Sequence, residues 1–347
     1  MRYVVLGRSG LRVSGLCLGT MTFDEEGQGW CVSKEEGRRI FEAFLDEGGN
    51  FVDTHTYGPT EDYLGEYMSG HRDRVVVATK YGGTLAHDDV NASGAHRKSM
   101  IRSVENSLRR LKTDYIDLLW LHAWDNLTPI DELLRATDDL VRTGKVLHLG
   151  VANAPAWAVA RFNTLADLCD RTPFCAIQVE YSLVEREPDR ELIPMADSLG
   201  LAIASWTPLA SGWLTGKYRQ GHGPAPGGPP RRLDDPVMTR FLPRTERNCT
   251  IAEEVCSIAD EVGCSPAHVA LNWLRSRGTI PIFGATSVVQ VKENVACFQV
   301  ELSDEQLARL SEVSRIKLGF PHDFLASGMV RRLMYGDKGH LIDKKPR

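Results

Sequence analysis

The sequence predicts a single α/β domain folded as a TIM (β/α)8 barrel. Short apolar runs alternate with longer helical patterns along most of the 347 residues, so strand follows helix in a regular period. Eight such runs are present, which is the number of parallel strands that closes a barrel of about 250 residues before insertions. With 42% apolar residues the chain can bury one large core, and we expect one domain over 1–347.

The expected strands are β-branched or apolar runs bounded by turn residues. A first, brief strand lies in "GLCLG" at 15–19, behind an N-terminal β-hairpin. The other seven strands are expected at 50–54, 74–80, 114–122, 145–153, 174–180, 201–206 and 279–285.

Amphipathic segments lie between these strands and predict the helices. The segment 33–49 ends in a glycine pair that can form its C-cap. The segment 98–114 places Ile101, Val104, Leu108 and Leu111 on one face. Further helices are expected at 129–142, 155–168, 189–199, 249–263 and 265–278, and an extra C-terminal helix is expected at 302–313.

Two stretches interrupt this rhythm and supply the long loops and the tail. Residues 218–247 are too rich in Pro and Gly to pack well, so we expect a long mobile loop at the C-terminal rim that could act as a lid. Residues 317–347 form a C-terminal extension with weak periodicity, and no secondary structure is assigned to them.

Composition argues against several classes of protein. The 41 Lys and Arg against 46 Asp and Glu give a formal charge of -5 without long blocks of like charge, so we expect neither a nucleic-acid nor a membrane-surface partner. No apolar stretch approaches about 18 residues, and we expect a soluble cytoplasmic protein. The eight cysteines form no CxxC pair, so neither disulfides nor a structural metal is expected.

Polar residues close the apolar strands at their C-terminal ends, and in a parallel barrel those ends share one rim. Taken alone, each is an ordinary strand end that meets solvent, but six on one rim favour a functional site. The residues are Asp53, Lys80, His122, Asn153, Gln178 and the Ser205–Trp206 pair.

Asp, Tyr, Lys and His together predict a tuned proton donor. A tyrosine with a pKa of about 10 is a poor acid at neutral pH, but a nearby ammonium stabilises the phenolate and a carboxylate can hold that ammonium. A histidine beside them can orient a substrate oxygen. The sequence contains no HExxH and no GxSxG, so neither a metalloprotease site nor a serine nucleophile is indicated. The four residues can supply a proton and orient a carbonyl, and reduction of that carbonyl would also need hydride from a cofactor.

Eight motifs in order carry a resemblance to a known family: "LGRSGLRVSGLCLGTMTF", "GNFVDTHTYG", "VVVATKYG", "DLLWLHAWD", "GKVLHLGVAN", "IQVEYSLVER", "SWTPLASGWLTGKY" and "IPIFGATSVVQVKEN". Over nearly its whole length the chain resembles the aldo-keto reductases, and among them aryl-alcohol dehydrogenase-like members. The resemblance implies a TIM barrel that binds NADPH across its C-terminal rim and reduces aldehydes or ketones. It also implies catalytic roles: Tyr57 is the general acid, Lys80 stabilises its phenolate, Asp53 holds Lys80, and His122 orients the carbonyl.

By the same resemblance, cofactor contacts are spread along the rim. Asn153 and Gln178 match the amides that bind the carboxamide, Trp206 matches the ring on which the nicotinamide stacks, and "TPLASGWLTGK" matches the pyrophosphate loop. The full set is Gly19, Thr20, Met21, Asn153, Gln178, Trp206, Thr207, Leu209, Ser211, Gly212, Leu214, Lys217, Gly284, Thr286, Ser287, Gln290 and Asn294.

Three departures from the family pattern affect this transfer. The aspartate and tyrosine are usually five positions apart in the family but four apart here, and the loop that follows is shorter. Ala152 replaces a usual serine before Asn153. Thr286 stands where many relatives have Arg or Lys against the 2'-phosphate, so NADH remains an alternative to NADPH unless Thr286, Ser287 and Arg275 compensate.

The substrate must be recognised by loops, and the sequence names only candidates for the pocket wall. These are Trp30, His55, Trp124 and the segment 82–100. His55 is interpreted either as a pocket donor or as a solvated loop side chain. Trp124 follows His122 on one strand face and suits a flat or apolar carbonyl substrate.

Two alternatives to a general carbonyl reductase stay open. The short loop between Asp53 and Tyr57 is compatible with a regulatory module that binds the cofactor with little turnover. The Pro- and Gly-rich loop is compatible with a reductase of nucleotide-linked keto sugars. The sequence sets no oligomeric state.

Overall fold

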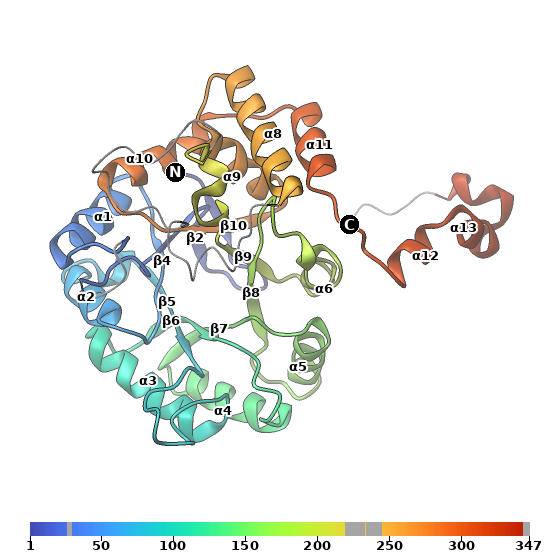
Figure 1. Ribbon diagram of the computed structural model, residues 1–347. Coiled ribbons are helices and arrows are strands. Elements are labelled where there is room, and N and C mark those ends of the chain that lie inside the picture. The colour runs from blue at the N-terminus through green and yellow to red at the C-terminus, as the bar shows by residue number, and fades with distance from the viewer. Residues whose placement is uncertain (26–29, 219–232, 234–244, 343–347) are drawn as a thin grey trace.

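The computed structural model describes residues 1–25, 30–218, 233 and 245–342. Its centre is a closed barrel of eight parallel strands, which confirms the predicted fold (Figure 1). In spatial order the strands are β10 (Thr279–Phe283), β3 (Cys17–Gly19), β4 (Phe51–Asp53), β5 (Val76–Tyr81), β6 (Ile116–Leu121), β7 (Val146–Ala152), β8 (Phe174–Glu180) and β9 (Ala202–Trp206). Each lies within three residues of its expected bounds at either end.

Helices surround the barrel on the outside (Figure 1). The α-helices are α1 (Lys34–Asp46), α2 (Thr60–Tyr67), α3 (Arg97–Leu111), α4 (Ile130–Arg142), α5 (Ala156–Leu168), α6 (Leu192–Leu199), α8 (Glu246–Val262), α9 (Pro266–Ser276), α10 (Val288–Ala296), α11 (Asp304–Val313), α12 (His322–Ala326) and α13 (Gly328–Tyr335). Short 3-10 turns are η1 (Arg72–Arg74), η2 (Glu187–Asp189), η3 (Ala210–Thr215), η5 (Cys297–Gln299) and η6 (Gly336–Leu341). None of the helices in the described ranges is long and apolar enough to cross a membrane.

Local capping explains where several helices begin and end. The hydroxyl of Ser33 accepts a hydrogen bond from the N–H of Glu36 at the start of α1, and Gly48 adopts a left-handed conformation just after it. Ser303 and Gln306 form a capping box at α11. Around the barrel, the helices α2 and α10 were not predicted, because the sequence of each segment is typical of a loop. On α3, Val104, Leu108 and Leu111 of the expected face are buried, whereas Ile101 is 42% exposed.

Two apolar layers hold the barrel together. One lies between the strands and the helices, and the other fills the barrel interior and is closed at its N-terminal end by the hairpin of β1 (Tyr3–Val5) and β2 (Arg12–Ser14). Trp120 lies fully buried in the interior, and a Cβ at Gly150 would come within 2.3 Å of its ring. Since side chains fill the interior, a ligand can bind only at the mouth.

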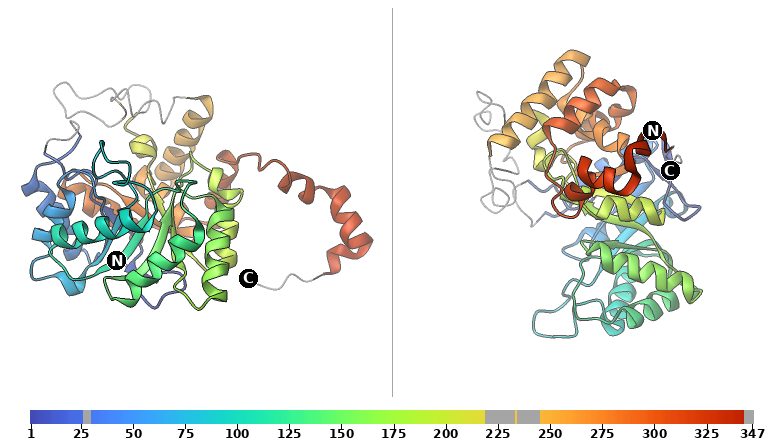
Figure 2. Two further views of the ribbon diagram at one scale, coloured as in Figure 1. Left: turned by 90° about the horizontal axis from the view of Figure 1, so that it is seen from below. Right: turned by 90° about the vertical axis from the view of Figure 1, so that its right-hand side faces the viewer.

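The two interrupting stretches differ in outcome. Most of the loop expected at 218–247 lies outside the described residues, although α8 already begins inside it at Glu246. The C-terminal extension, which received no assigned structure, forms α12, α13 and η6 and projects away from the barrel (Figures 1 and 2). Its base is held by hydrogen bonds from Arg190 to the carbonyl of Lys317 and between His322 and Glu191.

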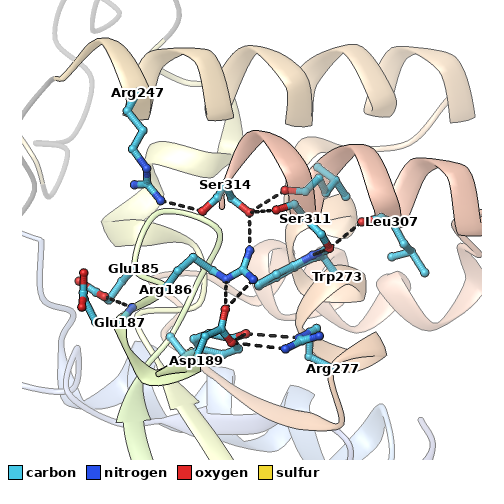
Figure 3. Close-up of polar contacts among 12 residues, drawn as sticks. Glu185, Arg186, Glu187, Asp189, Arg247, Trp273, Arg277, Leu307, Ser311 and Ser314 are labelled. Carbon is cyan, nitrogen blue, oxygen red and sulfur yellow. Dashed lines mark hydrogen bonds and ion pairs between the residues drawn. The ribbon is translucent and has the colours of Figure 1, made fainter. Parts of the chain in front are cut away.

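A buried polar network joins the loop after β8 to α9 and α11 (Figure 3). Arg186 donates to the carboxylate of Asp189 at 2.6 Å and to the hydroxyl of Ser314 at 2.6 Å, and its guanidinium lies 4.7 Å above the Trp273 ring. Asp189 also accepts from the hydroxyl of Tyr181 at 2.6 Å. The network therefore ties the C-terminal end of α11 to the loop after β8.

Replacing Asp189 with Ala should destabilise the protein by about 3–5 kcal/mol, because the guanidinium of Arg186 stays buried without its carboxylate. The free energy of unfolding from urea titration measures this change. Glu312→Ala is the matched control: it removes a carboxylate from an exposed ion pair with Arg315 and should cost less than about 1 kcal/mol. Equal losses in the two variants would contradict this account of the network.

Candidate active site

A buried ion pair lies at the C-terminal mouth of the barrel. Asp53 ends β4, Lys80 lies near the end of the adjacent β5, and both are buried. The ammonium of Lys80 lies 2.5 Å from Oδ2 of Asp53 and also donates to the carbonyl of Thr54 at 3.1 Å. The amide of Gln178 on β8 donates to the other carboxylate oxygen at 3.1 Å. Both charges are therefore paired and further hydrogen-bonded, as buried charges require.

Tyr57 lies on the loop between β4 and α2, above this ion pair. Its ring centroid is 5.8 Å from that of His122 and 5.7 Å from that of His55, and the residue is 44% exposed. A Cβ at Gly83 would come within 2.2 Å of the Tyr57 hydroxyl, so glycine at that position leaves room for it. Within the described part of the chain, no hydrogen bond joins this hydroxyl to Lys80 or His122. Such bonds often tighten only in the substrate complex.

The two histidines beside Tyr57 are neutral at pH 7. Burial lowers the pKa of His122, and the charge of Lys80 lowers it further, while Asp53 opposes the shift. Burial lowers the pKa of His55 to about 3, with further lowering from Lys80, His122 and Arg110. A neutral imidazole can donate one N–H to a carbonyl oxygen. The partial burial of His55 and the full burial of its Nε2 exclude the solvated-loop interpretation.

Two amides and an indole line the mouth on the β7 to β9 side. Asn153 follows β7 in a left-handed conformation, donates to the carbonyl of His122 at 2.9 Å and accepts from the indole of Trp206 at 3.2 Å. These contacts fix the Asn153 amide and the Trp206 ring relative to each other. Ser205, by contrast, is buried with its hydroxyl 3.4 Å from that of Thr279, so only Trp206 of the predicted pair belongs to the site.

The loop after β9 has a backbone suited to anions. Three consecutive residues, Ala210, Ser211 and Gly212, have positive φ angles, as does Thr207. Such conformations can turn successive N–H groups toward one point and form an anion-binding concavity. The ammonium of Lys217 lies close by, since a Cβ at Gly212 would be 2.5 Å from it. The N–H of Ala210 already donates to the carbonyl of Thr207 and that of Gly212 to the carbonyl of Leu209, so within this stretch the N–H of Ser211, together with Lys217, is what could meet a pyrophosphate.

The neighbouring segments complete the predicted rim set. Gly19 ends β3 beside Asp53, Thr20 donates its N–H to the carbonyl of Asp53, and Met21 is exposed. At the start of α10, Ser287 caps the helix and the Gln290 side chain accepts from the N–H of Thr286 at 2.8 Å. Gly284, Thr286 and Gln290 are exposed, whereas Leu214 and Asn294 are buried.

Arg275 does not belong to this rim, so of the three residues considered as compensation for the missing Arg or Lys it is the one that the structure removes. It lies near the C-terminal end of α9, just before β10 begins, and its guanidinium is 4.1 Å above the Phe298 ring. Since β10 runs from there toward the mouth, Arg275 lies at the opposite end of the barrel.

Two tryptophans lie on segments that follow the C-terminal ends of barrel strands. Trp124, on the loop after β6, packs edge-on against Trp157 at the start of α5, with ring centroids 6.2 Å apart. Trp157 is 59% exposed. Trp30 is partly buried beside the undescribed residues 26–29. Trp157 was not among the residues expected from the sequence, although it lies only four positions after Asn153. Gly83 falls in the expected segment 82–100, but its contact with the Tyr57 hydroxyl was not foreseen.

Comparison with known proteins identifies the family. The model of the "Aldo/keto reductase family" matches residues 15–315. The chain belongs to this family. It is 35% identical to a norsolorinic acid reductase of Emericella nidulans over 91% of this chain and 82% of that protein. An aryl-alcohol dehydrogenase of Pestalotiopsis microspora is 34% identical over 92% of this chain and 84% of its own length.

A third relative is named with its cofactor. The aryl-alcohol dehydrogenase [NADP(+)] of Phanerodontia chrysosporium is 32% identical to this aldo-keto reductase over 97% of this chain and 91% of that protein. The family and the names of these relatives show that the chain is an oxidoreductase of the kind that reduces carbonyl groups.

The neutral His55 should make stability depend on pH. Its pKa is about 3 when folded and about 6.5 when unfolded, so the unfolded chain binds the extra proton between these values. This contribution is complete above about pH 6.5 and is lost as the pH falls toward 3. Between pH 7 and pH 4 the free energy of unfolding should therefore fall more in wild type than in a His55→Leu variant. The difference between the two decreases should be roughly 1–3 kcal/mol. Parallel pH curves would contradict the prediction.

Proposed function

We propose that the protein reduces an aldehyde or ketone to an alcohol, with hydride from NADPH and a proton from Tyr57. The observation that carries this proposal is the buried Asp53–Lys80 ion pair at 2.5 Å, placed under a tyrosine and a neutral histidine. No residue in this set offers a nucleophile, so proton transfer and orientation are the chemistry that it can supply.

Each residue has a defined task in this proposal. The imidazole of His122 donates an N–H to the carbonyl oxygen and orients it, and Tyr57 gives its proton to the same oxygen. The ammonium of Lys80 stabilises the phenolate that remains, and Asp53 together with Gln178 holds Lys80 in place. A reduced nicotinamide supplies the hydride when it is bound.

The residues present fit a nicotinamide dinucleotide along the rim. Asn153 and Trp206 would hold the nicotinamide ring, and the left-handed backbone from Ala210 to Gly212 would hold the pyrophosphate. The start of α10, with Thr286, Ser287 and Gln290, would meet the adenosine end and its 2'-phosphate. The cofactor in the name of the Phanerodontia chrysosporium relative favours NADPH over NADH.

An aromatic carbonyl is the proposed substrate class. The exposed Trp157 and the partly buried Trp124 provide apolar ring faces and edges above the mouth, against which a flat ring can pack. The names of the aryl-alcohol dehydrogenases among the relatives support the same class. Tyr57 is exposed, which is also compatible with a different function, that of a module that binds NADPH with little turnover.

Replacing Tyr57 with Phe should lower kcat for an aromatic aldehyde by about 10² or more, because the general acid is lost while the ring is kept. Loss of NADPH absorbance measures turnover, and quenching of tryptophan fluorescence measures binding of NADPH and of NADH. Tyr335→Phe, which removes an exposed hydroxyl on α13, is the matched control and should leave both measurements unchanged.

Three outcomes would overturn parts of the proposal. Equal rates for wild type and Tyr57→Phe would mean that another group delivers the proton. Tight NADPH binding by wild type without turnover of any carbonyl would support the module with little turnover. A wild-type protein that binds neither NADPH nor NADH would exclude both the carbonyl reductase and the module with little turnover.

A further inference from the structure

His55 is bonded directly to the backbone of the proposed proton donor. Its Nδ1 accepts a hydrogen bond from the N–H of Tyr57 at 3.2 Å, and the two rings lie in contact with their centroids 5.7 Å apart. Only Thr56 separates the two residues in the chain. The side chain of His55 therefore holds the backbone of the short loop between Asp53 and Tyr57.

Burial and this bond together define the protonation state and the tautomer of His55. The imidazole is neutral at pH 7, because its pKa is lowered to about 3. Since Nδ1 accepts a hydrogen bond, the single ring proton lies on Nε2. Nε2 is buried and has no hydrogen-bond partner among the described residues.

That unpaired N–H gives a reason to look for a function. A buried donor without an acceptor costs about 1–3 kcal/mol, and an apolar side chain of similar size would avoid this cost. The bond from Tyr57 to Nδ1 is the only side-chain hydrogen bond that His55 makes within the described ranges. Burial alone therefore does not account for histidine at this position, whereas its bond to Tyr57 does.

The other side of the loop is held by different residues. Arg110 on α3 donates to the carbonyls of Thr56 and Gly58, and the hydroxyl of Thr60 donates to the carbonyl of His55 at 3.1 Å. These bonds involve only carbonyl groups of the loop, whereas the N–H of Tyr57 donates to His55. The backbone at Tyr57 is thus fixed from both sides, with its hydroxyl beside Gly83.

We infer that His55 is a positioning residue: its Nδ1 holds the Tyr57 backbone so that the tyrosine ring stays beside His122 at the mouth of the barrel. The inference rests on the proposed function of Tyr57 as proton donor. His55 itself gives no proton and touches Tyr57 through one hydrogen bond and one ring contact. A displacement of about 1 Å at the reacting group can lower the rate about 10²-fold, so loss of this hydrogen bond should lower kcat.

Two variants separate this role from simple packing. His55→Leu keeps the size of the side chain but removes the acceptor, and kcat for an aromatic aldehyde should fall about 10- to 100-fold while the Kd for NADPH changes less than about threefold. His55→Asn returns an oxygen near the position of Nδ1 and should recover most of that loss. His71→Leu, an exposed histidine on another loop, is the matched control and should behave as wild type.

A double-mutant cycle tests whether His55 acts through Tyr57. In a Tyr57→Phe background, His55→Leu should lower the residual rate less than about twofold, because the proton donor is already gone. A full 10- to 100-fold loss in both backgrounds would overturn the inference, and so would a His55→Leu variant as active as wild type. Absence of turnover in wild type would instead count against the proposed function.

Hydrogen exchange gives a readout that needs no turnover. In His55→Leu, a peptide covering 54–60 should exchange one amide faster than in wild type, and His55→Asn should restore its protection. Unchanged exchange in His55→Leu would overturn the inference even if the proposed function is correct. Thermal unfolding of each variant confirms that it is folded under the assay conditions.

Discussion

The ion pair between Asp53 and Lys80 is the interaction on which the site depends. Two charges are taken out of water at the end of two neighbouring strands, which is tolerated only because Thr54 and Gln178 supply further hydrogen bonds. The same ammonium helps to keep both nearby histidines neutral. This charge thus adds to the effect of burial on the two histidines, and in the proposed reaction it would stabilise a phenolate at Tyr57.

The barrel makes this arrangement possible because it separates packing from chemistry. The interior below the mouth is filled by side chains such as Trp120, and the hairpin of β1 and β2 closes the other end. Strands β4, β5 and β8 hold their polar residues rigidly, since each strand is bonded on both sides. Tyr57 and Trp124, in contrast, lie on loops whose positions depend on a few contacts, and in the proposed function these loops would recognise the substrate.

Much of the fold and of the candidate site could be predicted from the sequence, for physical reasons. An apolar run that ends in a polar residue marks a strand end, so Asp53, Lys80 and His122 could be placed on one rim without a structure. The room that Gly83 leaves for Tyr57 and the burial of His55 could not, because they arise from contacts between loops. The place of Arg275 also follows from the sequence pattern, because a helix that leads into a barrel strand ends at the opposite side from the site.

The most direct test of the account is turnover by a Lys80→Met/Asp53→Asn double variant, which removes the ion pair without leaving a buried unpaired charge. Rates with an aromatic aldehyde and NADPH should be measured beside the NADPH dissociation constant and the unfolding transition. The account predicts a folded protein that still binds NADPH but loses about 10² or more in kcat. A folded variant that binds NADPH and reduces the aldehyde at the wild-type rate would contradict it.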